Sequence, residues 1–308
     1  MITTRKIELL APAKNLECGI EAIKHGADAV YIGAPMFSAR SAAGNTIEEI
    51  TALCEYAHMY NAKIYVALNT ILNDKELNDA ERLIKQLYYE AKADALIIQD
   101  MGILKLNLPP IPLHASTQID TRTPEKAKFL EEAGFKQIVL ARELTIDQIH
   151  DITSQVKTPI EVFVHGALCV CYSGQCYLSE ALSNRSANKG SCAQYCRLPY
   201  TMEDAKGEEI IARKHLLSMK DLNLSDDLED LLDARVTSFK IEGRLKDVEY
   251  VKNTVAYYRK KLDSIFARRP EYTKASDGVS TYTFEPNLEK SFNRGFTKYF
   301  LHDRTSNI

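Results

Sequence analysis

The sequence predicts an α/β protein folded as a (β/α)8 TIM-like barrel, and two features of the 308-residue chain indicate it. Eight short runs of apolar and β-branched residues recur along the chain, and each is nearly continuous in apolar character, as strands covered on both faces are. Stretches with apolar residues at helical spacing follow most of these runs. Eight such repeats are typical of a closed parallel barrel. An open, doubly wound sheet is the alternative, because periodicity does not show whether a sheet closes.

The predicted strands are separated by segments with helical periodicity, for example Ile47–Tyr60, Asp79–Lys92 and Pro124–Ala133. Asn61 and Gly134 mark the ends of two helices, because these residue types tolerate the left-handed backbone of a helix stop. The eight predicted strands, in chain order, are Ile7–Ala11, Ala29–Ile32, Ile64–Leu68, Ala95–Ile98, Leu113–Ser116, Gln137–Leu140, Ile160–Val164 and Ser238–Ile241.

One interval breaks the repeat, because a long insertion at about 166–234 separates the seventh strand from the eighth and carries most of the cysteines. After the last long predicted helix, Val248–Phe266, the chain becomes polar and rich in Ser and Thr. We therefore expect a barrel domain at 1–269 that includes the insertion. Residues 270–308 are expected to be a short accessory segment, the start of a small domain, with truncation as an open alternative.

The overall composition indicates a folded, water-soluble chain. It has 39 Lys+Arg against 42 Asp+Glu, a net charge of −3, and 45% hydrophobic residues, which excludes a disordered chain or a polybasic nucleic-acid tail. No apolar run approaches the length of a membrane span, and the N-terminus lacks the apolar region of a signal peptide. We expect a cytoplasmic protein without a membrane partner. Residues 238–270 carry nine Lys+Arg against four Asp+Glu, which suits either an RNA-binding stripe or a solvated helix face.

Polar and charged residues follow the predicted strands, at the rim where barrels place their active sites. The runs at 141–143 and 240–244 are the most charged; because they follow buried strands, we expect them to pair with each other or with an anionic ligand. The residues predicted as catalytic are Gln118, Glu143 and Glu242, and those predicted to bind substrate are Arg40, Arg142, His165 and Arg244.

Five of the seven cysteines fall within 28 residues of the insertion. A reducing compartment disfavours disulfides, so such a group is more typical of a metal site or a catalytic thiol. Apart from Cys171, the spacing is Cys-x6-Cys-x15-Cys-x3-Cys, formed by Cys169, Cys176, Cys192 and Cys196. The first gap is long for a zinc site, so the spacing favours an iron–sulfur cluster, with zinc and free thiols as alternatives.

The residues around Cys169 resemble a known family. The run Glu161-x-Phe-x2-Gly-Ala-Leu-Cys169-x4-Gly-x-Cys176-x-Leu-Ser179 closely resembles the hallmark of the U-32 (collagenase-like) peptidase family. Further similarity lies at 8–13, 28–33, 238–244 and 292–297, so the resemblance covers almost the whole chain.

The resemblance implies a function that differs from the family name. Better understood members are oxygen-independent hydroxylases that hold a [4Fe–4S] cluster on four cysteines, and they act on tRNA, on rRNA or on ubiquinone precursors. By position, the resemblance implies Cys169, Cys176, Cys192 and Cys196 as ligands, with Cys171 as a bystander. It also implies prephenate as a co-substrate, tRNA or rRNA as substrate, and a paralogous protein or cluster-assembly proteins as partners. The expected function is RNA hydroxylation, forming 5-hydroxyuridine in tRNA.

Proteolysis is the alternative function. Some family members are described as collagenases, and His165 precedes Cys169 by four residues, a spacing that allows a Cys–His pair. No orienting partner for the histidine is identifiable, and the chain has no His-Glu-x-x-His run. The hydroxylase is therefore the preferred hypothesis.

Overall fold

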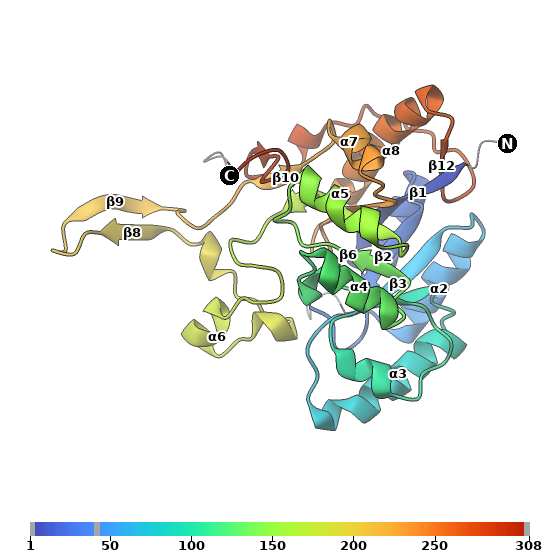
Figure 1. Cartoon of the computed structure of the whole chain (residues 1–308), viewed down its shortest axis with the longest axis horizontal. Helices are drawn as coiled ribbons and strands as arrows, with labels where there is room; N and C mark the ends of the chain where they lie inside the picture. Colours follow the sequence, from blue (N-terminus) through green and yellow to red (C-terminus); the bar gives the residue numbers. More distant parts are fainter. Residues whose placement is uncertain (1–3, 40–43, 305–308) are drawn as a thin grey trace.

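A computed structural model, which describes residues 4–39 and 44–304, confirms the closed parallel barrel (Figure 1). Each strand pairs in parallel with the next, and the last pairs with both the seventh and the first, so the sheet closes and the open-sheet alternative is wrong. The barrel strands are β1 (Arg5–Ala13), β2 (Ala29–Gly33), β3 (Lys63–Leu68), β4 (Ala95–Ile98), β5 (Leu113–Ala115), β6 (Gln137–Val139), β7 (Ile160–Ala167) and β11 (Ser238–Ile241).

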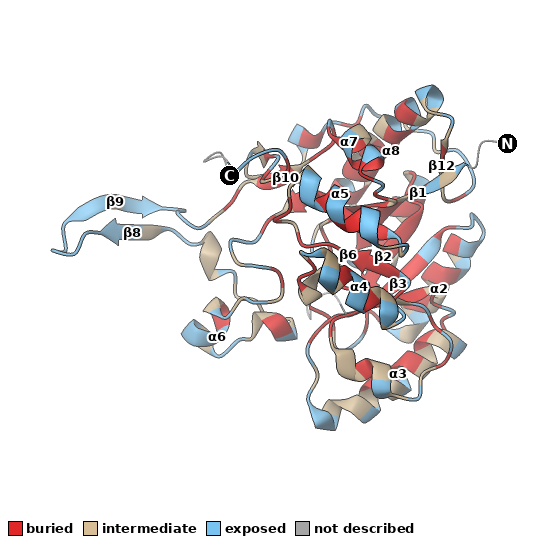
Figure 2. Cartoon of the chain, viewed as in Figure 1, coloured by how far each residue is buried: buried red, intermediate tan, exposed pale blue. Residues whose placement is uncertain are grey.

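Helices cover the outside of the barrel and turn their apolar sides toward the strands (Figure 2). The helix starts are specified locally. Thr46 and Glu49 form a capping box at the start of the helix Ile47–His58. Thr123 caps the helix Pro124–Glu132, which begins with a proline. Between β4 and β5 the chain makes only the short 3-10 helix η3 (Met101–Lys105). The covering helices are α1 (Leu16–Lys24), α2 (Ile47–His58), α3 (Leu77–Tyr89), α4 (Pro124–Glu132), α5 (Ile146–Gln155), α7 (Leu228–Asp233) and α8 (Val248–Arg268).

The insertion between β7 and β11 contains a short helix, a protruding ribbon and an added strand. After α6 (Leu178–Ser183), strands β8 (Tyr200–Glu203) and β9 (Glu209–Lys214) form an antiparallel ribbon that projects from the barrel and is largely exposed (Figures 1 and 2). The chain then returns as β10 (Asp221–Asn223), which pairs antiparallel with the end of β7. The insertion thus begins and ends at the same strand.

The described part of the C-terminal segment packs back onto the barrel. Strand β12 (Tyr272–Lys274) pairs with β1, and β13 (Phe296–Thr297) pairs with β10. Asp227, at the start of α7, binds this segment through Lys298 at 2.7 Å and His302 at 2.6 Å. Apolar side chains of the C-terminal segment, such as that of Leu301, belong to the main core.

The interior of the barrel contains a buried polar network, although barrel cores are usually apolar. Glu161 is fully buried and pairs with Lys240 at 2.6 Å. Gln137 donates to Glu161 and also lies 3.4 Å from Glu8, whose other oxygen accepts from Tyr65 at 2.5 Å. Glu161 is thus paired with a lysine, whereas Glu8 accepts hydrogen bonds from neutral groups, including the Ser238 hydroxyl at 2.6 Å. Burial raises the pKa of Glu8 to about 7, and the nearby Glu161 carboxylate adds to this.

This network predicts a pH-dependent stability that originates in Glu8. Between its ordinary pKa and about 7, Glu8 keeps its proton in the folded state and releases it in the unfolded chain. The unfolded state then binds fewer protons, so the contribution of Glu8 to the free energy of unfolding falls as pH rises. We expect Glu8→Gln to stabilise the protein at pH 8 by on the order of 2 kcal/mol. The gain should vanish toward pH 5, as measured by urea unfolding; an equal gain at both pH values would contradict the assignment.

Candidate active site

The cysteine-bearing insertion is fastened to the carboxyl ends of the barrel strands at two close contacts. A Cβ added at Gly174 would lie 2.0 Å from the carbonyl oxygen of Gln118, in the loop after β5. A Cβ added at Gly190 would lie 2.4 Å from the carbonyl oxygen of Ser38, in the loop after β2. Both glycines also have φ values, +71° and +85°, that L side chains rarely adopt. The insertion therefore contacts the rim where the polar strand-end residues lie.

Side chains of the loop after β5 hold the first half of the insertion. Asp120 is buried, accepts from the Gln175 amide at 2.5 Å and pairs with Arg122 at 2.9 Å. The Arg122 guanidinium in turn lies 4.2 Å from the centre of the Tyr172 ring. Sequence reasoning missed these residues, although the charged run 120–122 follows a strand in the same way as 141–143.

The cysteines of the insertion are electrostatic neighbours. Burial raises the pKa of the Cys196 thiol; Arg197 opposes this, and the thiols of Cys169, Cys192 and Cys176 raise it further. Cys169 is exposed and the other three are partly buried. Cys171 also belongs to the group: burial raises its pKa first, and the neighbouring Cys176 adds to the shift. The structure thus brings together the four predicted ligands and the predicted bystander.

The thiols do not form a compact group of three. Among the residues that the structure describes, no three cysteine sulfurs lie within 4.8 Å of one another. In a tetrahedral zinc site, with Zn–S bonds of about 2.3 Å, the sulfurs are only about 3.8 Å apart. The geometry of the described chain therefore differs from that of a compact zinc site.

Two arginines on the rim are held by aromatic rings. Arg142 pairs with Glu242 at 3.2 Å, and its guanidinium lies 4.0 Å from the centre of the Phe163 ring. The two charged runs thus pair with each other, as the sequence indicates. Arg244 is buried and donates to the Ser38 hydroxyl at 2.7 Å, with the Tyr31 ring 5.6 Å away. Such rings orient a guanidinium group.

Glu143 is buried beside this pair. Burial raises the pKa of the Glu143 carboxyl, and Asp120 adds to the shift, whereas Arg142 opposes it. Tyr299 of the C-terminal segment is a further neighbour: burial raises its pKa to about 12, and Glu143, Tyr172 and Cys169 act on it through their charges. Glu143 therefore lies on the same side of the barrel as the cysteine loop.

Buried polar atoms without a partner gather at this rim. Within the described ranges, five of the eleven such atoms follow β4, β5 and β6, next to the insertion, and the others lie elsewhere, for example on Arg5, Thr254 and Arg259. A buried polar atom that lacks a hydrogen bond is costly, so a concentration of them is typical of a ligand site. The five unpartnered atoms at the rim are Gln99 Oε1, Asp120 Oδ1, Thr121 Oγ1, Arg142 Nε and Glu143 Oε2.

Two predicted residues do not join this group. The side chain of His165 is buried among the rings of Tyr250, Tyr258 and Phe296, at centroid distances of 5.5–6.1 Å. Burial lowers the pKa of His165 to about 3, so the imidazole is neutral. Arg40 lies outside the described residues.

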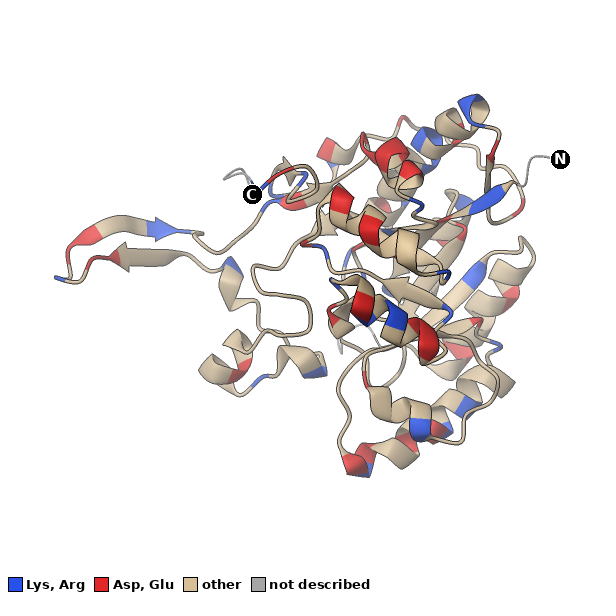
Figure 3. Cartoon of the chain, viewed as in Figure 1, with Lys and Arg blue, Asp and Glu red and all other residues tan. Residues whose placement is uncertain are grey.

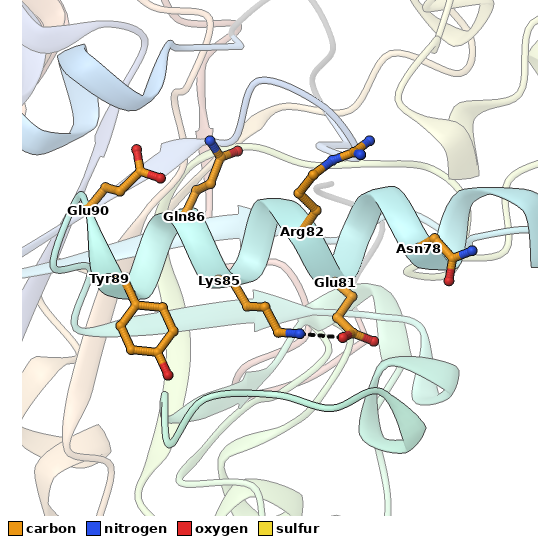
Figure 4. Close-up of a pocket in the computed structure, with 7 residues that line it drawn as sticks. All are labelled: Asn78, Glu81, Arg82, Lys85, Gln86, Tyr89 and Glu90. Atoms are coloured by element: carbon orange, nitrogen blue, oxygen red, sulfur yellow. Dashed lines mark hydrogen bonds and ion pairs between the residues drawn. The ribbon is translucent and has the colours of Figure 1, made fainter.

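Other surface features do not coincide with the rim. A groove on α3, shown in Figure 4, is lined by helix residues such as Glu81, Lys85 and Tyr89, none of which is predicted for the site.

On α8 each Lys and Arg of the predicted basic stripe makes an ion pair, for example Lys261 with Asp226 at 2.8 Å. Basic and acidic residues are interspersed on the outer helices (Figure 3). This favours a solvated helix face over an RNA-binding stripe. Among the described helices, none has the length and apolar character needed to span a membrane.

Three curated relatives resemble the chain over nearly its whole length. The 23S rRNA 5-hydroxycytidine C2501 synthase of Escherichia coli is 55% identical, over 100% of this chain and 47% of that protein. The tRNA hydroxylation protein P1 of Bacillus subtilis is 37% identical, over 86% of this chain and 65% of that protein. The collagenase of Porphyromonas gingivalis is 33% identical, over 96% of this chain and 74% of that protein. The chain spans about half the length of the Escherichia coli relative.

The family assignment agrees with the hallmark around Cys169. A family model, described as peptidase family U32, matches residues 14–308. The match covers the chain after β1, including the other barrel strands, the cysteine insertion and the C-terminal segment. The chain therefore belongs to peptidase family U32.

Proposed function

We propose that this chain forms the catalytic barrel of an RNA hydroxylase that adds a hydroxyl group to a pyrimidine base without molecular oxygen. One observation supports the proposal most strongly. The insertion that carries five neighbouring thiols is packed against the barrel rim, where buried polar atoms lack hydrogen-bond partners. The relative at 55% identity favours a cytidine of 23S rRNA as the target over the tRNA uridine expected from the sequence.

In this proposal a [4Fe–4S] cluster is held by Cys169, Cys176, Cys192 and Cys196. Thiolates are the ligands such clusters prefer, and a cluster core is larger than a single metal ion. When bound, the cluster supplies electron transfer or activation of the bound reactants.

The other rim residues bind reactants and move protons. Arg142 and Arg244 present guanidinium groups suited to the carboxylates of a small anionic co-substrate, for which prephenate is the candidate. Glu143 has a free oxygen and a raised pKa, so it suits the role of a general acid. Gln118 and Glu242 complete the proposed catalytic group. The backbone of Gln118 contacts Gly174 of the insertion, and the carbonyl oxygen of Glu242, just after β11, accepts from the Tyr250 hydroxyl.

Glu143→Gln tests the acid role. We expect the turnover number to fall roughly a hundredfold, as is typical for the loss of a general acid. Because burial raises the pKa of Glu143, the wild type should lose activity as pH rises past that pKa, and the variant should lack this limb of the profile. The melting temperature should be nearly unchanged, since a glutamine amide has the size and hydrogen-bonding capacity of a protonated carboxyl group. If the variant still loses activity as pH rises, that loss originates in another titrating group.

Proteolysis through a Cys–His pair has little support from the geometry. A neutral histidine enclosed by aromatic rings does not stabilise a thiolate, and His165 has this environment. The hydroxyl of Tyr258 lies 3.4 Å from its Nδ1 atom, on the side of α8. The cysteines are left to the proposed cluster.

The deciding experiment compares both activities in one anaerobic preparation. Iron and sulfide would be measured, and the protein would be expressed in a bacterium that lacks its own RNA hydroxylases. Mass spectrometry of digested rRNA and tRNA should then show 5-hydroxycytidine in 23S rRNA. 5-Hydroxyuridine in tRNA instead would keep the hydroxylase and correct its substrate. Cleavage of gelatin by cluster-free protein, with no hydroxylated base, would establish the peptidase.

A further inference from the structure

Tyr172 is an exposed aromatic ring in a rigid position on the cysteine loop. Its side chain is 53% exposed, although the loop on which it lies is tightly anchored. The backbone carbonyl of Tyr172 accepts from the Gln175 amide at 3.2 Å, and Gly174 packs against the backbone of Gln118. The Arg122 guanidinium lies over the ring at 4.2 Å and is itself held by Asp120. The ring is thus fixed while much of its surface is open.

The buried ring of Tyr299 is an electrostatic neighbour of Tyr172 and leads to a further ring and arginine. Tyr299, the neighbour of Tyr172, Glu143 and Cys169 described above, stacks on Phe300 with ring centres 3.9 Å apart and an interplanar angle of 20°. Arg304 lies 5.2 Å from the centre of the Phe300 ring. Aromatic side chains with arginines beside them are the usual components of surfaces that bind unpaired bases.

The charge of the cysteine loop suits a polyanion. Residues 169–198 contain three Lys+Arg and one Asp+Glu, in a chain whose net charge is −3. Val170 and Tyr177, on the same loop, are 46% and 64% exposed. Clustered exposed apolar groups mark a binding surface, and the positive balance favours nucleic acid over an acidic protein.

We propose that Tyr172 is a stacking platform for an unpaired RNA base that flanks the base delivered to the cysteine site. This inference rests on the proposed RNA hydroxylation and adds the form of the substrate. A base inside a duplex offers no free face, so the target is a loop, bulge or single strand from which bases are extruded. Arg122 covers part of the ring and strengthens stacking on the remainder, because a guanidinium polarises the ring.

Binding of short oligonucleotides tests the platform. Fluorescence anisotropy would measure the affinity of the full chain for a single-stranded RNA of about ten nucleotides and for the same sequence in a duplex. We expect Tyr172→Ala to weaken single-strand binding roughly tenfold or more and to leave the weaker duplex binding unchanged. Tyr172→Phe, which keeps the ring, should bind like the wild type. Tyr89→Ala is the matched control, because Tyr89 is also exposed, at 59%, but lies on α3 (Figure 4).

A base analogue gives a second readout that a folding defect does not imitate. 2-Aminopurine next to the target position should be quenched by the wild type and by Tyr172→Phe, but not by Tyr172→Ala with unchanged iron content. Equal single-strand affinity and equal quenching in Tyr172→Ala would overturn the platform, while retained hydroxylation would leave the proposed function intact. If the wild type binds neither RNA, both proposals fail, and the exposed loop belongs to a protein interface.

Discussion

Replacing any one of Cys169, Cys176, Cys192 or Cys196 with serine is expected to reduce RNA hydroxylation on the order of a hundredfold or more. A serine hydroxyl is a hard, weak ligand, so the loss of one thiolate should lead to the loss of the whole proposed cluster. The four variants should also lose the brown absorbance and the iron of the anaerobic protein. Hydroxylated nucleosides would be measured by mass spectrometry, with circular dichroism to show that the barrel is folded.

Cys171→Ser is the matched control within the same loop. Cys171 lies beside Cys176, and its thiol is 3.3 Å from the carbonyl oxygen of Gln175, a contact that a hydroxyl can also make. We expect nearly normal iron content and activity. Loss of iron in Cys171→Ser together with its retention in Cys176→Ser would exchange the roles of these two residues. Loss of an activity in only one of the five variants would indicate a thiol nucleophile instead of a cluster.

Gly174→Ala is expected to have a comparably large effect without removing any ligand. The new methyl group would lie 2.0 Å from the backbone carbonyl oxygen of Gln118, and its position is fixed by the backbone of residue 174, so no side-chain rotation relieves the clash. The loop that carries Cys169 and Cys176 must then move away from the rim. We expect loss of most of the bound iron and of hydroxylation, with a melting temperature set by the intact barrel.

A second glycine separates this displacement from simple backbone strain. Gly207, at the turn of the β8–β9 ribbon, has a φ of +84°, and a Cβ added there would meet nothing within 4 Å. Gly207→Ala therefore carries the strain of a positive φ without the clash. It should keep its iron and its activity. If both glycine variants lose activity equally, strain and not the position of the cysteine loop is the cause.

The barrel strands were predictable because each is a continuous apolar run, and burial on both faces imposes this composition. The strands added outside the barrel, β10 and β13, could not be predicted from the sequence. β10 begins with Asp221, which pairs with Arg294 at 3.3 Å, and β13 has only two residues, so neither has the length or apolar character of a strand. Between β4 and β5 the predicted pattern of strand and helix is replaced by η3, whose few apolar residues pack without a full helix.

At the site, the rim could be predicted from strand ends, but the direction of individual side chains could not. Phe163 pairs with Lys240, but the next pair along β11 is Ile241 with His165, so Val164 is an extra residue in β7. Such a bulge reverses the alternation of side chains, and His165 consequently packs against α8 instead of the barrel interior. The contact between Gly174 and Gln118 was equally inaccessible, because it joins segments far apart in the sequence.

The pairing of β10 with the end of β7 also determines how the chain can complete its fold. The last barrel strand, β11, must reach β7 across the entire insertion, and the entropy lost in closing a loop rises with its length. Once β10 has returned to β7, only α7 and short connections separate it from β11, so closure becomes a local step. Because loop entropy grows only with the logarithm of length, residues can be added or removed at the turn of the β8–β9 ribbon with little effect on folding speed or equilibrium. The barrel and its cysteine-bearing insertion can therefore change in length independently of each other.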